Sequence, residues 1–233
     1  MQNERDIFIF ASLPTSYPFG FPVEGDEQIP ALATLSLSDI PAYLCAFDQP
    51  SRARIVGQTA LHFYRDDKKF MRVLLNPEKY VRDFSKYKAI LTPDCSLTFG
   101  MPPSKRAHQT RLSRVAGAIW QSRGLLVIPS LRWVDDSDYD LICSGIPQGS
   151  VFAVSNDGSI RDPKLRDNFS KGLLEVVSRL NPVAIIVFGR LPDLLLSKLE
   201  STTQVFQYSA PTASPVRCSN RKTESNENDL FEN

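Results

Sequence analysis

An acid and a hydroxyl lie between an apolar run and a helix-forming segment in the middle of the chain. Asp94 and Ser96 follow residues 89–93, and the helical pattern begins near residue 104. A carboxylate placed there could act as a general base, a metal ligand or an acceptor for a ribose hydroxyl. It could equally cap a turn. No histidine stands beside Ser96, so a serine triad has no local support. Asp94 and Ser96 are therefore the catalytic candidates.

The helix predicted over residues 104–123 carries several basic residues and no acid. His108, Arg111 and Arg114 are spaced three apart and so share one flank of that helix. The helix N-terminus adds partial positive charge, and together these groups would suit a phosphate or a carboxylate. The alternative is a solvated face whose arginine stems lie over the core.

Further ligand-binding candidates follow other apolar runs. Trp133 could stack on a base or ring, or it could simply close the core. Ser155 and Asp157 end the run before Gly158, whose freedom of conformation lets backbone amides approach an anion. Arg190 follows a glycine in the place where late loops of a barrel commonly hold phosphate.

The acid-rich segment 132–140 could offer several carboxylate oxygens to a divalent ion. It lacks the glycine and the final glutamate of a calcium-binding loop, so we favour Asp135 or Asp136 as the cap of a short helix through Ile142. The four cysteines form no CxxC pair, and with two histidines a zinc site is not expected. No metal site is predicted, and the residues name no cofactor.

The elements that must position these residues are apolar runs alternating with helical patterns. Because the runs are apolar almost throughout, they predict parallel strands buried on both faces. Right-handed crossovers then give an α/β fold of mostly parallel strands. The regular spacing favours a (β/α)-barrel-like fold, complete or incomplete, and an open doubly wound sheet is the alternative. In either case the site candidates lie at the carboxyl ends of the strands. The predicted helices are 104–123, 163–180 and 192–200, and the predicted strands are 42–47, 59–64, 89–94, 125–131, 151–156, 184–189 and 204–209.

The two ends of the chain differ from its middle. Residues 1–28 predict an irregular arm packed by aromatic rings, residues 29–210 a single α/β domain, and residues 211–233 a disordered tail. The formal net charge of +1 indicates no partner by itself. The N-terminus is a poor secretion signal and no run of about 18 apolar residues occurs, so we expect a cytoplasmic protein without a membrane span.

From about Ala60 to Gly189 the chain resembles the bacterial, phage and plasmid family known as domain of unknown function 4417. Cys95 stands where the family's typical form has Phe, and Leu112 where it has Arg, so this chain has one arginine fewer within its basic helix. The resemblance implies a mobile-element context and no established activity. It rests on the stretches HFYRDDKKF (62–70), NPEKYV (76–81), LTPDCS (91–96), GAIWQSRGLLVIPSLRW (117–133), GIPQGSVFAVSNDG (145–158) and RLNPVAIIVFG (179–189).

Three hypotheses for function follow. The first is an enzyme that binds a phosphorylated or nucleotide-like molecule, with Arg111 and Arg114 on the anion, Asp94 as base or metal ligand, and Trp133 on a ring. Ser96, Ser155 and Asp157 would orient the substrate. The second is a nucleic-acid-binding accessory protein of phage or plasmid replication, whose basic helix contacts phosphates. The third is a host-takeover adaptor that binds a protein through its arm or tail.

Overall fold

Two parallel sheets organise the protein. The structure is a computed structural model that describes residues 20–156, 163–208 and 216–219. The first sheet has the strand order β6-β5-β4-β3, and the second has the order β10-β9-β8-β7. The strands of the first sheet are β3 (Tyr43–Ala46), β4 (Thr59–His62), β5 (Ala89–Leu91) and β6 (Val127–Ile128). Those of the second are β7 (Ser130–Leu131), β8 (Val151–Ser155), β9 (Ala184–Phe188) and β10 (Gln204–Tyr208).

The sheets adjoin at two places. On one side β11 (Val216–Ser219) pairs antiparallel with both β3 and β10. On the other side Pro129 alone separates β6 from β7. The Thr92 amide donates to Ile128 O at 2.9 Å, and the Ala153 amide donates to Pro129 O at 2.8 Å. One extended run therefore pairs with the first sheet through its first half and with the second sheet through its second half.

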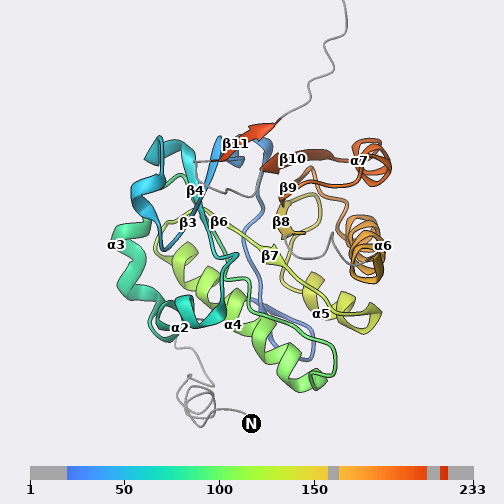
Figure 1. Ribbon diagram of the computed structural model, residues 1–233. Coiled ribbons are helices and arrows are strands. Elements are labelled where there is room, and N and C mark those ends of the chain that lie inside the picture. Colours follow the sequence, from blue (N-terminus) through green and yellow to red (C-terminus); the bar gives the residue numbers. More distant parts are fainter. Residues whose placement is uncertain (1–19, 157–162, 209–215, 220–233) are drawn as a thin grey trace, which may run out of the picture.

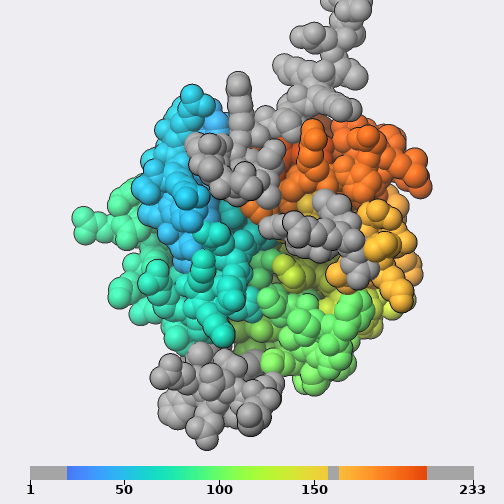
Figure 2. Space-filling model, in the orientation of Figure 1, coloured from blue at the N-terminus to red at the C-terminus, as the bar shows by residue number. Residues whose placement is uncertain are grey.

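The α/β class and the mostly parallel strands are confirmed, but the barrel is not closed. In the described part of the chain no hydrogen-bonded ladder joins β6 to β7, although Pro129 links these two strands along the chain. The arrangement is consistent with the open, doubly wound alternative. In Figure 2 the blue-to-teal part of the chain lies on the left of the molecule and the yellow-to-orange part on the right.

Helices cover the outer face of each sheet (Figure 1). Against the first sheet lie α2 (Asp67–Leu75), α3 (Val81–Phe84) and α4 (Pro103–Ser122). Against the second lie α5 (Tyr139–Cys143), α6 (Pro163–Leu180) and α7 (Asp193–Glu200). The remaining elements are the hairpin β1 (Val23–Glu24) and β2 (Ile29–Pro30) and the 3-10 helices η1 (Leu37–Asp39), η2 (Pro50–Arg52), η3 (Val56–Gln58), η4 (Pro77–Tyr80) and η5 (Asp136–Asp138). No described helix has both the length and the apolar character needed to cross a membrane.

A third core cluster lies between the two sheets. Alternate residues of each strand point inward, and several of them are alanines: Ala60 and Ala89 from the first sheet, Ala153 and Ala184 from the second. All four are essentially unexposed. Such small side chains let the inner faces approach closely, so little open space remains between the sheets below their carboxyl ends.

Most predicted elements form where the sequence placed them. Each predicted strand segment contains a strand, although 125–131 is divided at Pro129, and the three predicted helices correspond to α4, α6 and α7. The sequence did not reveal α2, α3 or β11. Part of the expected irregular arm forms β1, and residues 216–219 of the expected disordered tail form β11. Residues 1–19 of the arm, and residues 211–215 and 220–233 of the tail, lie outside the described residues.

Gly172 provides a test of how α6 packs on the second sheet. A Cβ atom there would lie 2.1 Å from Nε1 of Trp133, a buried ring. We expect Gly172→Ala to lower the free energy of unfolding by about 1–3 kcal/mol through overpacking, which outweighs the gain in helix propensity of about 1 kcal/mol. Denaturant titration measures the change. Ser178→Ala, at an exposed position of the same helix, should change stability by less than about 0.5 kcal/mol. Equal stability of both variants would contradict this packing.

Candidate functional site

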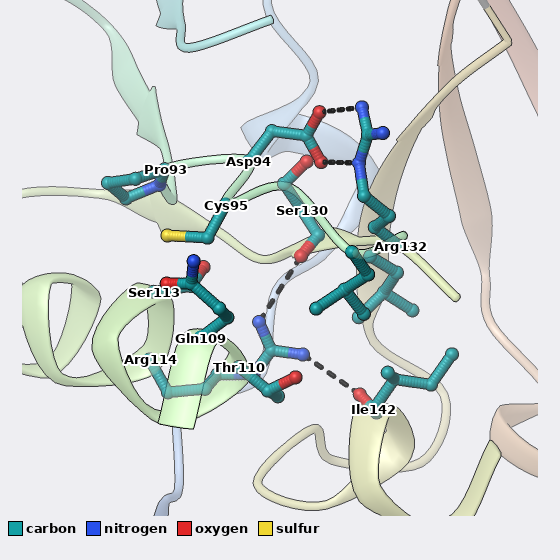
Figure 3. Close-up of a pocket in the computed structure, with 12 residues that line it drawn as sticks. Pro93, Asp94, Cys95, Gln109, Thr110, Ser113, Arg114, Ser130, Arg132 and Ile142 are labelled. Carbon is teal, nitrogen blue, oxygen red and sulfur yellow. Dashed lines mark hydrogen bonds and ion pairs between the residues drawn. The ribbon is translucent and has the colours of Figure 1, made fainter. Parts of the chain in front are cut away.

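A two-point ion pair lies at the carboxyl ends of β5 and β7. Arg132 Nε donates to Asp94 Oδ1 at 3.0 Å, and Nη2 donates to Oδ2 at 2.5 Å (Figure 3). The Asp94 side chain is 5% exposed and that of Arg132 is 40% exposed. The negative charge of Asp94 raises the pKa of Arg132. Within the described residues nothing bonds to Nη1 of Arg132, which Figure 3 shows turned away from Asp94.

A second pair joins the same turn to the start of α2. The Ser96 hydroxyl donates to Asp67 Oδ1 at 2.8 Å, and the Ser96 amide donates to Oδ2 at 3.1 Å. Burial raises the pKa of Asp67, the two Ser96 hydrogen bonds lower it, and the charge of Asp94 raises it. A carboxylate with a raised pKa beside a hydroxyl is an arrangement that can accept and return a proton. The same bonds also anchor the Asp94–Ser96 turn.

Aromatic rings form an apolar floor beneath these pairs. The rings of His62, Tyr64 and Phe188 contact one another: the centroid of His62 lies 5.4 Å from that of Tyr64 and 4.5 Å from that of Phe188, and the last two are 5.0 Å apart. Burial lowers the pKa of His62 to about 3, and its Nδ1 accepts a hydrogen bond from the Tyr64 amide at 3.2 Å. The Ser130 hydroxyl donates to the Tyr64 oxygen at 3.0 Å. His62 is thus a neutral histidine of the core.

A cleft of about 320 Å³ opens beside the ion pair. Arg132, Trp133 and Ser155 line one part of it, and Phe99, whose surface is 66% exposed, lines another. Trp133 stacks on Phe169 with ring centroids 5.5 Å apart and planes inclined by 16°. It therefore fills the core and also contributes to the cleft wall, so both roles considered for it are compatible with its position.

The structure brings some of the predicted site residues together and separates others. Asp94 and Ser96 lie on one turn, and Trp133 and Ser155 line the cleft. Arg190 is exposed and borders a different hollow of about 270 Å³ beside α7 and β10. Asp157 and Gly158 lie outside the described residues.

The basic residues of α4 are largely turned into the protein. Arg114 is 1% exposed and donates to Ser130 O at 3.3 Å and to Ile142 O at 2.9 Å. Burial lowers its pKa to about 10. His108 and Arg111 are half-buried, and burial together with the charge of Arg111 lowers the pKa of His108.

The acid-rich segment takes the structural role that we favoured. Asp135 caps η5 by accepting from the Ser137 amide at 3.1 Å. The buried Asp138 accepts from the Val134 amide at 2.8 Å and pairs with Arg106 Nη1, also at 2.8 Å. Among the residues that the structure describes, no three His, Cys, Asp or Glu side chains are grouped so as to hold a metal ion.

Two partners of the predicted catalytic residues were missed by sequence reasoning. Both Asp67 and Arg132 occur in stretches shared with the family, but the sequence indicated neither as a site residue. The alternation of inward and outward residues along β7 could have placed Arg132 on the same face as Ser130. Nothing local in the sequence indicates the pairing of Asp67 with Ser96.

Comparison with known proteins now identifies the family. Residues 21–209 match the family described as domain of unknown function (DUF4417). This chain belongs to that family. It is 36% identical over 155 residues to the Gene 1 protein of Mycobacterium phage L5, an alignment that covers 65% of this chain and 67% of the relative. It is 35% identical over 174 residues to the Gene 1 protein of Mycobacterium phage D29, covering 73% of this chain and 63% of the relative. No solved structure matches this family member.

The Asp94–Arg132 pair can be tested by removing its charge without changing its shape. Asp94→Asn leaves one acceptor but no carboxylate, so we expect the free energy of unfolding to fall by about 1–3 kcal/mol, the range for hydrogen bonds to charged groups. Chemical denaturation measures this. Asp83→Asn, which removes an exposed partner of Lys86, should leave stability unchanged within error. Equal effects of the two variants would indicate that the buried pair contributes little.

His62 should remain neutral across the whole range in which the protein is folded. Its pKa of about 3 lies below the value of about 6.5 in an unfolded chain, so between these values the unfolded chain binds more protons. His62 therefore lowers stability as pH falls below about 6.5. In proton NMR spectra recorded from pH 8 to 4, the imidazole signals of only one of the two histidines should titrate. His108→Gln should remove that signal, and titration of the remaining one near pH 6 would contradict the assignment.

Proposed function

We propose that this protein binds a small molecule that carries one anionic group and a ring, such as a nucleoside monophosphate, at the carboxyl ends of its strands. The observation that carries the proposal is the Arg132 guanidinium, which is fixed on one edge by Asp94 while Nη1 remains available beside the cleft. The enzyme hypothesis from the sequence placed Arg114 on the anion. We now propose Arg132, in place of Arg114, as the principal ligand of the anion.

The fixed guanidinium supports recognition of an anion. An arginine held by two parallel bonds has lost most of its rotational freedom already, so a ligand that binds it orders little more. Because Asp94 balances its charge, the pair offers directed hydrogen bonds more than net positive potential. This favours a single phosphate or carboxylate over a long polyphosphate.

The walls of the cleft support a ring. Phe99 is 66% exposed, and Trp133 and Phe169 form a stacked pair in the lining. Apolar and aromatic walls with a few directed polar groups are typical of small-molecule sites. Ser155, at the end of β8, adds a hydroxyl to the same lining.

The Ser96–Asp67 pair supports a catalytic role at this site. Asp67 is close enough to Asp94 and Arg132 for their charges to affect its pKa. A proton taken from the Ser96 hydroxyl or from a ligand could be held on Asp67, whose pKa burial raises. The enzyme hypothesis therefore assigns Asp67 as the base and Ser96 as the group that it orients or activates.

The arrangement gives less support to nucleic-acid binding. Arg106 and Arg114 are 8% and 1% exposed, and each is engaged inside the protein. The net charge of +1 adds no general attraction to phosphates. We therefore keep the small-molecule site as our proposal.

Thermal unfolding with a panel of ligands tests the proposal. The panel holds nucleoside mono- and triphosphates, sugar phosphates and short DNA and RNA strands. We expect a saturable rise in Tm with one class of small molecule. Arg132→Gln should weaken that binding about 10-fold or more, because it removes a charge-assisted contact of about 1.5–3 kcal/mol. Isothermal titration gives the dissociation constants.

Arg82→Gln, at an exposed position on α3, is the matched control and should bind as the unaltered protein does. Undiminished binding by Arg132→Gln would assign the ligand to another site. A shift with oligonucleotides alone, fading with salt, would replace the proposal with nucleic-acid binding.

A further inference from the structure

The side chain of Arg114 is a buried charge without a counter-charge. It is 1% exposed, and its two hydrogen bonds go to backbone carbonyls, Ser130 O and Ile142 O (Figure 3). No carboxylate within the described residues forms an ion pair with it, and its Nε has no hydrogen-bond partner there. Buried charges in proteins are normally paired, because an unpaired charge in a dry interior is costly.

The neighbouring ionisable groups do not supply the missing charge. The nearest are the thiols of Cys95 and Cys143, and burial raises the pKa of each, so both are neutral near pH 7. Asp94 belongs to the same surroundings, but both of its oxygens accept from Arg132, which offsets its charge. Arg114 therefore keeps a positive charge that no described side chain balances.

A small cavity lies against this guanidinium. Its volume is about 20 Å³, enough for one water or one monatomic ion. Thr110, Ser113 and Gln109 of α4 contribute polar groups to its wall, and Figure 3 shows them grouped beside Arg114. The rest of the wall includes apolar side chains such as Leu97, together with Asp94 and Arg132, whose opposite charges are paired with each other. The apolar part of the wall reduces screening and so strengthens the attraction between Arg114 and an anion.

We propose that this cavity binds a single monatomic anion, of which chloride is the example, as the counter-ion of Arg114. A water molecule would fill the space but leave the charge of Arg114 unbalanced. A monovalent anion fills the space and also balances that charge. The cavity is too small for a nucleotide. The inference is thus independent of the proposed function, although Arg132 borders both spaces.

The test compares anions at constant ionic strength. Thermal unfolding of the full chain is followed while sodium chloride replaces sodium gluconate, whose anion is too large for the cavity. We expect Tm to rise with chloride and then to saturate. Bromide should have the same effect. Arg114→Met, which removes the charge and keeps the length of the side chain, should lose the chloride-dependent rise.

Arg123→Met is the matched control, since Arg123 lies at the end of the same helix and pairs with Glu78 near the surface. It should keep the full chloride-dependent rise. If Arg114→Met does not fold, bromide in crystals of the unaltered protein decides the question: an anomalous scattering peak beside Arg114 supports the proposal. Equal Tm in chloride and gluconate, or a water in the cavity of crystals grown with bromide, would overturn it.

Discussion

The passage of one extended run through both sheets is the constraint on which the rest of the structure depends. Ile128 O accepts from the first sheet and Pro129 O from the second, so the backbone is fixed from both sides. Proline has no amide hydrogen, and it is tolerated here because no ladder bond is required of its nitrogen. Ser130 and Arg132 follow directly. Their positions between the sheets are consequences of this backbone path.

The layer between the sheets explains why a polar pair can be stable at their carboxyl ends. Alanines bring the inner faces together lower down, and His62, Tyr64 and Phe188 stack across the top of that layer. This aromatic floor keeps water away from one side of the Asp94–Arg132 pair. Low local polarity strengthens a pair whose hydrogen bonds are satisfied, and it would penalise either member left alone.

The helix α4 demonstrates that a basic segment need not form a basic surface. Arg106 is held by Asp135 and Asp138, and Arg114 by two carbonyls, because this helix packs between the first sheet and α5. The charges thus connect elements inside the domain. The family match and the two phage relatives name no activity, so function has to be inferred from the site and not from the relatives.

The sequence by itself determined the local elements and their polarity. Apolar runs and helical patterns act over a few residues, and they therefore predicted the strands, the helices and the edge that holds Asp94. The partners of the site were decided only by tertiary structure. Arg132 lies 38 residues from Asp94, and Asp67 lies 29 residues from Ser96. Such pairs form because parallel strands bring their carboxyl ends to one edge, and no local pattern specifies which side chains then meet.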